Sequence, residues 1–249
     1  MSGHSKWSKI KRSKGAADAS RGQLFTKLGR EISVAVRQGG ADPQANFKLR
    51  LIVQKARDNN MPLENIDRAI KRASGGTDGA SLSEVTYEGY GPGGSAIMVQ
   101  VLTDNKNRTI SEVRNILSRG GGNLGDSGSV TWLFESRGVI IIDSTKENAE
   151  EVALFAIDAG AEDVKIDGTS LEVTTKPQDL EAVRKALEQR KVPISSSDLS
   201  MVPKTMVKLD EKSALQALKL LDKLEELDEV QRVYTNADFP DEVLSKYSG

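Results

Sequence analysis

The sequence predicts an α+β multidomain protein, with a helical N-terminal domain followed by two mixed α/β ferredoxin-like domains, one inserted in the other. Apolar residues recur at helical spacing before residue 73, and the pattern changes to that of strands after residue 84. The segment between them, ASGGTDGASLSE, has no period and is rich in Gly and Ser, which is typical of a flexible linker. Aromatic residues make up only 4% of the 249 residues, so the expected cores are aliphatic.

Residues 1–78 are expected to form a basic helical domain. A first helix is expected over residues 16–38, ending at the pair Gly39-Gly40. A second helix follows Pro43, and Pro62 suits the first turn of a third. The apolar faces expected to form one small core comprise Leu24, Phe25, Leu28, Ile32, Ala35 and Val36 in the first helix, Phe47, Leu51, Ile52 and Ala56 in the second, and Leu63, Ile66 and Ile70 in the third.

Residues 79–136 and 205–249 are expected to form a discontinuous α/β domain. In the first part, VTYEGY and SAIMVQVLTD are typical of strands joined by the tight turn GPGG, and NRTISEVRNILSR is typical of a helix. A glycine-rich loop then leads to a predicted strand, SVTWLFE. The second part would add a strand at 205–209, a helix at 213–227 and the strand VQRVYTN to the same domain.

Residues 137–204 are expected to form the inserted domain. The pattern predicts a strand at 138–143, a helix at 146–159 and a hairpin around Gly168. A helix at 177–190 and a strand within 193–202 complete the order β-α-β-β-α-β, which is the ferredoxin-like order.

Charge is distributed unevenly along a chain whose net charge is −1. Residues 1–76 carry 16 Lys and Arg against 6 Asp and Glu, whereas residues 77–249 carry 19 against 30. Such a division predicts a polyanionic partner for the basic part, and nucleic acid is the expected one. The alternative is that the basic part docks on the acidic remainder of its own chain.

The first 14 residues, MSGHSKWSKIKRSK, are predicted to form an arm that neutralises phosphates, which would make binding weaken steeply with salt. Trp7 would stack on an exposed base, worth about 1–3 kcal/mol, or would instead anchor the arm on the helices. Neither role reads a base sequence. The predicted nucleic-acid-binding residues are Lys6, Trp7, Lys9, Lys11, Arg12, Lys14, Arg21, Lys27, Arg30, Lys71, Arg72 and Arg108.

Two loop motifs allow both a structural and a functional interpretation. GYGPGG is most simply a hairpin turn, but Tyr90, Gly91 and Gly93 would also allow a backbone of RNA or protein to approach closely. In TDNKNRT, Asp104 or Asn107 can cap a helix, and Arg108 near the helix N-terminus could hold a phosphate.

The composition argues against most enzyme chemistries. Cysteine is absent and His4 is the single histidine, which excludes disulfides and thiolate or zinc–cysteine sites. GDSG at 125–128 matches the tetrapeptide around a serine-protease nucleophile, but that chemistry needs a histidine base. The acids of LDKLEELDE alternate with leucines and are expected on a solvated helix face. We therefore expect no catalytic residues, no metal and no cofactor.

No run of apolar residues approaches the length of a membrane helix, and the basic N-terminus lacks the apolar core of a secretory signal. That N-terminus has some likeness to a mitochondrial presequence but lacks an apolar helical face. We therefore expect a cytoplasmic monomer without a membrane partner, although nothing in the sequence fixes the oligomeric state.

Several long motifs, in one order along the chain, resemble the YebC/PmpR family: GHSKW, KGAADASRGQLFTKLGREI, MPLENIDRAIKR, YEGYGPGG, LTDNKNRT and GGNLGDSGSVTWLF. The resemblance implies a three-domain cytoplasmic α/β protein with a helical N-terminal domain, commonly described as a DNA-binding transcriptional regulator. It also implies kinship with a mitochondrial translational activator of cytochrome c oxidase, and with bacterial proteins tied to the ribosome and to stalled proline-rich synthesis.

Two functions follow as hypotheses, and an enzyme is the third and weakest. The first is a regulator that binds promoter DNA, and the second is a ribosome-associated translation factor that binds ribosomal RNA. A DNA reader usually presents a recognition helix to the major groove, and no helix here is an obvious one. Basic arms and glycine-rich loops suit a cleft between RNA and protein, so the physical argument favours RNA while the family label favours transcription.

Overall fold

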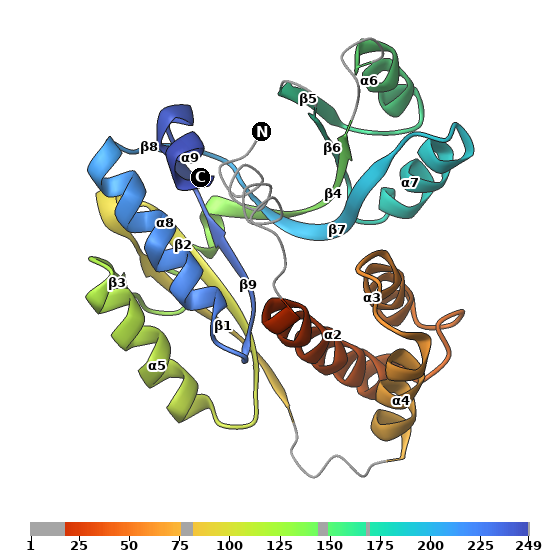
Figure 1. Ribbon diagram of the computed structural model, residues 1–249, viewed down its shortest axis with the longest axis horizontal. Coiled ribbons are helices and arrows are strands. Elements are labelled where there is room, and N and C mark those ends of the chain that lie inside the picture. Colours follow the sequence, from red (N-terminus) through yellow and green to blue (C-terminus); the bar gives the residue numbers. More distant parts are fainter. Residues whose placement is uncertain (1–17, 76–81, 144–148, 168–169, 249) are drawn as a thin grey trace.

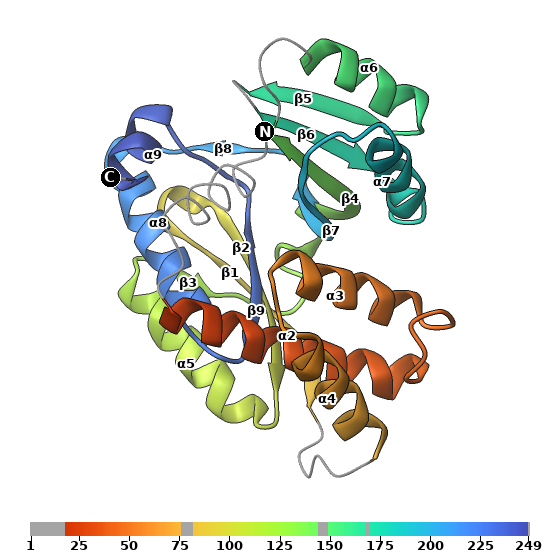
Figure 2. The same ribbon diagram turned by 45° about the vertical axis from the view of Figure 1, so that its right-hand side comes forward.

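The structure is a computed structural model that describes residues 18–75, 82–143, 149–167 and 170–248. These residues form a helical region (18–75), a middle region (82–133 and 204–248) and an inserted region (134–203). Figures 1 and 2 show the helical region beside the middle region and next to the β7 side of the inserted region. The predicted α+β class, with a helical first part and two sheet-containing parts, is confirmed.

The helical region buries the aliphatic stripe that the sequence predicts, with Leu28, Ile32, Leu49 and Ile66 nearly inaccessible. The side chain of Asn46 joins two of the helices, because its Nδ2 donates to the carbonyl oxygen of Ala35 at 2.8 Å while its Oδ1 accepts from Leu49 N at 3.0 Å. Phe47 and Leu63, which the pattern also assigned to the core, are 38% and 59% exposed. The helices are α2 (Asp18–Gly39), α3 (Phe47–Asp58) and α4 (Leu63–Ser74).

The middle region is an antiparallel sheet of order β3-β1-β2-β9, with its central hairpin formed by β1 and β2. Side chains alternate along β2, so Ile97, Val99 and Val101 pack with the helices while Ala96 and Met98 pack on the other face. The bounds are β1 (Ser83–Tyr90), β2 (Ala96–Thr103), α5 (Lys106–Arg119), β3 (Asn123–Leu124), α8 (Glu211–Glu225), β9 (Val230–Thr235) and α9 (Asp241–Ser248).

The ferredoxin-like order occurs in the inserted region, which follows β-α-β-β-α-β with the sheet order β5-β6-β4-β7. The middle region has another order, because its two central strands are consecutive in the sequence. The inserted elements are β4 (Phe134–Asp143), α6 (Ala149–Asp158), β5 (Asp163–Asp167), β6 (Ser170–Thr175), α7 (Leu180–Gln189) and β7 (Ile194–Pro203).

Two strand predictions were wrong. SVTWLFE and the strand at 138–143 are not separate: Thr131–Leu133 is a 3₁₀ turn, η2, and β4 runs through the predicted limit between residues 136 and 137. The reason is long-range pairing, since β7 pairs with β4 from Pro203, opposite Phe134. The strand at 205–209 is reduced to β8 (Val207–Lys208), which pairs in parallel with β10 (Ala237–Asp238) and does not join the main sheet.

Candidate nucleic-acid interface

Of the twelve residues predicted to bind nucleic acid, six lie outside the described residues. The interpretation of the arm and the two roles considered for Trp7 therefore stay predictions. These residues are Lys6, Trp7, Lys9, Lys11, Arg12 and Lys14.

Lys27 and Arg30, on α2, are bonded within the chain. Lys27 Nζ donates to the carbonyl oxygen of Glu225 at 2.6 Å, and Arg30 Nη1 donates to that of Asp228 at 2.7 Å. These carbonyls belong to the turn at residues 225–229, here called the acidic turn, where the last carbonyls of α8 lack helical partners. These two cations bind backbone carbonyl oxygens of their own chain where the sequence analysis expected a phosphate. They therefore dock α2 on the middle region, as the alternative interpretation describes.

Arg108, on α5, is also paired within the chain. Its Nη2 lies 3.0 Å from Asp104 Oδ1 and 2.8 Å from Glu229 Oε1, again in the acidic turn. Desolvation would lower the pKa of Arg108, but the two carboxylates outweigh it and raise that pKa above its ordinary value. The cap of α5 is Asn105, whose Oδ1 accepts from Arg108 N at 3.1 Å, and not Asp104 or Asn107. A phosphate at Arg108 would have to displace two carboxylates.

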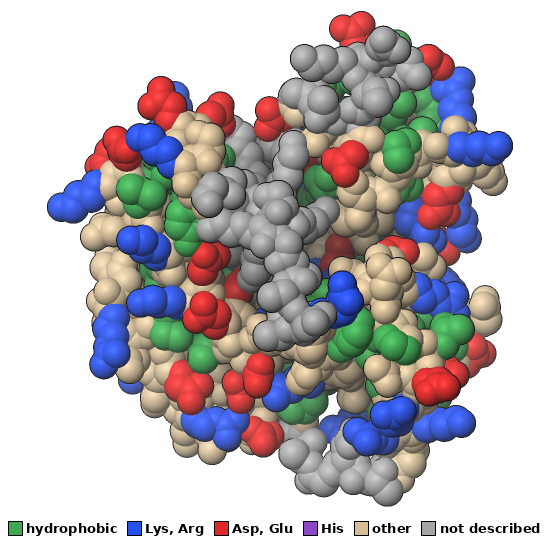
Figure 3. All heavy atoms as spheres, in the orientation of Figure 1, with side chains coloured by type: hydrophobic (Ala, Val, Ile, Leu, Met, Phe, Trp, Pro, Cys, Tyr) green, Lys and Arg blue, Asp and Glu red, His purple; other side chains and the backbone are tan. Residues whose placement is uncertain are grey.

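Arg68, Lys71 and Arg72 form the α4 basic face. Their i, i+3, i+4 spacing places them on one side of the helix, and all three are exposed. Within the described part of the chain, none of the three takes part in an ion pair. Figure 3 shows Lys and Arg side chains gathered at the lower right, over α4. This face keeps two of the sequence-predicted residues and adds Arg68; Arg21, also predicted, is exposed on α2.

The loop between β1 and β2 is the predicted hairpin turn. Gly91 N donates to Ser95 O at 2.7 Å. Gly93 has φ of +69°, and a Cβ there would lie 2.5 Å from Leu209 Cδ2. Packing within the chain therefore accounts for Gly91, where a Cβ would meet Ile97 Cδ1 at 2.7 Å, and for Gly93, with no need for an approaching RNA. Tyr90 is half-exposed, and its hydroxyl donates to Ser129 O at 3.2 Å.

Glu88 is a buried carboxylate that organises the glycine-rich loop after β3. It accepts from Gly128 N at 2.7 Å and from Val130 N and Thr131 N at 2.8 Å each. Burial would raise the pKa of Glu88, but these amide bonds outweigh it and hold that pKa below its ordinary value. Alternation along β1 places Glu88 with Glu84 and Thr86, opposite Val85 and Tyr87, so no local signal in the sequence predicts that this carboxylate is buried.

The same loop carries an exposed tryptophan that the sequence analysis missed. Trp132 is 65% exposed, and its indole Nε1–H donates to Ser129 O at 3.0 Å. Lys204 Nζ donates to the Trp132 carbonyl oxygen at 2.9 Å. The reason that the sequence analysis missed Trp132 is the strand predicted for SVTWLFE. In a strand, alternate side chains point into a core, so the prediction gave no reason to expect Trp132 to be exposed.

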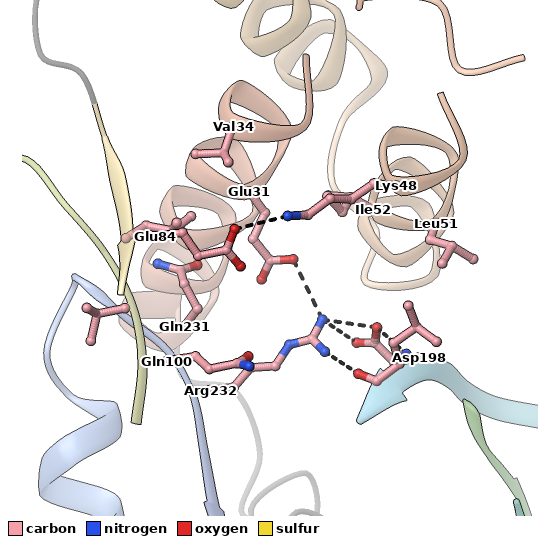
Figure 4. Close-up of a pocket in the computed structure, with 13 residues that line it drawn as sticks. Glu31, Val34, Lys48, Leu51, Ile52, Glu84, Gln100, Asp198, Gln231 and Arg232 are labelled. Carbon is pink, nitrogen blue, oxygen red and sulfur yellow. Dashed lines mark hydrogen bonds and ion pairs between the residues drawn. The ribbon is translucent and has the colours of Figure 1, made fainter. Parts of the chain in front are cut away.

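A cluster of four charges joins the three regions, and Figure 4 shows three of them, Glu31, Asp198 and Arg232. Arg232, on β9, holds both oxygens of Asp198, on β7, at 3.0 and 2.8 Å, and its Nη2 lies 3.8 Å from Glu31 Oε2, on α2. Lys55, on α3, lies 3.1 Å from Asp198 and 3.6 Å from Glu31. Burial would raise the pKa of Asp198, but Arg232 and Lys55 outweigh it and lower that pKa.

The cluster borders a cleft of about 140 Å³ between the three regions. The cleft is lined by both charges and aliphatic residues, and Figure 4 shows the side chains of Arg232 and Asp198 directed toward each other. Lys48 at its rim pairs with Glu84 at 3.1 Å. Because its cations are paired, the cleft is a joint between regions and not a site for phosphate. No group of three possible metal ligands occurs among the residues that the structure describes.

Family models match nearly the whole chain. The TACO1/YebC N-terminal domain matches residues 5–76, and the TACO1/YebC second and third domain matches residues 82–237. The chain belongs to the TACO1/YebC family. This confirms the resemblance that the sequence motifs carried.

Members of the TACO1/YebC family from several bacteria are similar to this chain over its full length. A probable transcriptional regulatory protein of Dehalococcoides mccartyi is 55% identical over 99% of this chain and 98% of its own. One of Rubrobacter xylanophilus is 53% identical over 100% of both chains. A solved structure, that of a conserved hypothetical protein from Aquifex aeolicus, is 46% identical and superposes with a TM-score of 0.82, covering 90% of this chain and 92% of the other.

The names of these TACO1/YebC relatives support a regulator and do not name a reaction. They do not state what such a regulator binds. Among the described residues, no helix has the length and apolar character needed to cross a membrane.

Proposed function

We propose that this TACO1/YebC protein is a non-enzymatic regulator of gene expression that binds nucleic acid through the α4 basic face and the N-terminal arm. The observation that carries the proposal is the exposure of Arg68, Lys71 and Arg72, which have no carboxylate partner among the residues that the structure describes, in a chain whose net charge is −1. Most other cations of the helical region are bonded to other regions. The α4 basic face is therefore the described surface best suited to phosphates.

The expected binding is to the backbone and not to a base sequence. Each phosphate that Arg or Lys neutralises releases condensed counterions, so affinity should fall steeply with salt. Phosphate contacts fix position on a nucleic acid, while sequence is read by side chains in the grooves. The names of its relatives indicate a role in transcription, and DNA would be the expected target of a regulator that acts there.

A second candidate is a translation factor that binds ribosomal RNA. The exposed, hydrogen-bonded indole of Trp132 favours it, because folded RNA displays unstacked bases and duplex DNA does not. Both candidate functions need the α4 basic face. They differ at the loop that carries Trp132, which would contact RNA in a translation factor and would have no unpaired base to contact in duplex DNA.

The test is a titration of the full-length protein with a DNA duplex and with a structured ribosomal RNA fragment. Replacing Arg68, Lys71 and Arg72 by Ala should weaken binding to both by at least tenfold at physiological salt. A matched variant, Lys212→Ala, Lys219→Ala and Lys223→Ala on exposed positions of α8, removes the same charge elsewhere and should bind nearly as wild type. Equal losses in the two variants would mean that net charge, and not this face, governs binding.

The choice between the two candidates needs a separate measurement. Crosslinking in cells, followed by mapping to promoters or to ribosomal RNA, distinguishes them directly. Absence of the protein from ribosome fractions at low salt would count against the translation factor.

A further inference from the structure

We propose that Trp132 is a stacking site for an unpaired base of single-stranded RNA, an inference that rests on the proposed function and deepens it. The residues two positions before and after it are buried: Val130 and Phe134 are 0% and 4% exposed, while Trp132 is 65% exposed. The loop therefore buries Val130 and Phe134 in the core but leaves its largest apolar side chain, Trp132, exposed to solvent.

The indole is held in one orientation. Its Nε1–H donates to Ser129 O at 3.0 Å, and the hydroxyl of Tyr90 donates to the same oxygen at 3.2 Å. Single exposed apolar side chains are normal on protein surfaces. Leu154 on α6 is one, since it is 69% exposed, and it has no polar group that a hydrogen bond could fix. Fixing the ring in advance lowers the entropy lost when a flat ligand stacks on it.

The backbone beneath the indole is fixed as well. Three backbone amides of the loop, those of Gly128, Val130 and Thr131, donate to the buried carboxylate of Glu88. On the other side, Lys204 N donates to Leu133 O at 2.8 Å, so the two chain crossings between the middle and inserted regions are bonded to each other. Hydrogen bonds on both sides therefore hold the backbone that carries Trp132 in place.

The chemistry beside the ring favours a nucleotide. The ammonium of Lys204 uses one of its three N–H donors on the Trp132 carbonyl oxygen, which leaves donors for a phosphate next to the aromatic surface. Proteins that bind single strands combine these two features, an aromatic surface for the base and a cation for the backbone. A duplex keeps its bases stacked on each other, so only an unpaired base can take this position.

Two measurements test the proposal on the full-length chain. Because the protein has two tryptophans, Trp7→Phe leaves Trp132 as the only indole, and its fluorescence reports stacking directly. Single-stranded oligouridylate should quench that fluorescence, and an RNA duplex of equal length should not. Separately, in the wild-type background, Trp132→Ala should weaken oligouridylate binding about tenfold, Trp132→Phe should retain most of it, and Leu154→Ala should change nothing.

The outcomes separate this inference from the proposed function. Binding of oligouridylate without quenching, and with equal affinity in Trp132→Ala, overturns the stacking site and leaves the regulator standing. Failure of wild type to bind any nucleic acid overturns both. If a proline-rich peptide quenched the fluorescence and RNA did not, Trp132 would be a contact for a polypeptide, and the proposal that an RNA base stacks on it would be wrong. Far-ultraviolet circular dichroism and the urea midpoint of Trp132→Ala test whether the variant is folded, because neither depends on the indole that is removed.

Discussion

The cations of α2 and α3 and those of α4 come from one basic stretch of sequence, yet they do different work. Lys27, Arg30 and Lys55 bond to the middle and inserted regions, whereas Arg68, Lys71 and Arg72 face outward without ion pairs among the described residues. The excess of basic residues in residues 1–76 is therefore larger than the cationic surface available to phosphates. Their place in the fold decides which of them join regions and which can bind a partner.

The largest expected effect is at the charged joint. Asp198→Ala would leave Arg232, 22% exposed, without its bidentate partner. Removing one member of a buried pair costs about 3–5 kcal/mol, and partial exposure here reduces the expectation to about 2–3 kcal/mol of unfolding free energy in urea.

The matched control is Asp163→Asn, which breaks an exposed pair with Lys165 and should leave the urea midpoint nearly unchanged. An equal loss in both variants would mean that the joint is no more than a surface ion pair. Limited proteolysis of Asp198→Ala should also cut between regions sooner, because the joint connects all three.

A second, smaller effect concerns Glu88. Its pKa is lowered in the folded protein, so the carboxylate contributes stability above the unfolded pKa of about 4.3–4.5 and loses it as pH falls through the folded pKa. Glu88→Gln should cost about 1.5–3 kcal/mol at pH 7, and the difference from wild type should shrink below about pH 4.

Unfolding in urea at a series of pH values checks this, with Glu84→Gln on the same strand as the control, since that change breaks only the exposed pair with Lys48. A difference that stays constant down to pH 3 would show that the charge of Glu88 is not what holds the loop.

The third effect is at α2. Replacing Lys27 and Arg30 by Ala removes two hydrogen bonds to the acidic turn and should lower stability by about 1–2 kcal/mol. The same variant should bind nucleic acid with little change, because both cations are already bonded to the acidic turn. A loss of affinity as large as that of the α4 variant would remove the distinction between the two sets of cations.

Much of the fold follows from local pattern. The stripe of Leu28, Ile32 and Ile66 has helical spacing, and the alternation along β2 has strand spacing, so both are visible in the sequence. The continuity of β4 was not, because the local pattern places Phe134 in a separate strand, and it is the pairing with β7, 60 or more residues later, that joins Phe134 and Asp143 in one strand. Register across such distances is set by tertiary contacts that no short window contains.

The candidate site was predicted less well, for a related reason. Sequence identifies Lys27, Arg30 and Arg108 as cations, but their pairing with the acidic turn depends on how the regions pack. Trp132 was hidden by an incorrect strand, and its exposure follows from the 3₁₀ turn that takes the strand's place. Lys71 and Arg72 were correctly placed on an outer face because they lie opposite a local apolar stripe.

The most direct test of the account is the salt dependence of nucleic-acid binding in three proteins: wild type, the α4 variant lacking Arg68, Lys71 and Arg72, and the α2 variant lacking Lys27 and Arg30. For a DNA duplex, each lost phosphate contact lowers the slope of log K against log salt by about 0.9. The account predicts a slope smaller by about 2–3 for the α4 variant and unchanged for the α2 variant. An unchanged slope in the α4 variant, or an equal decrease in both, would contradict it.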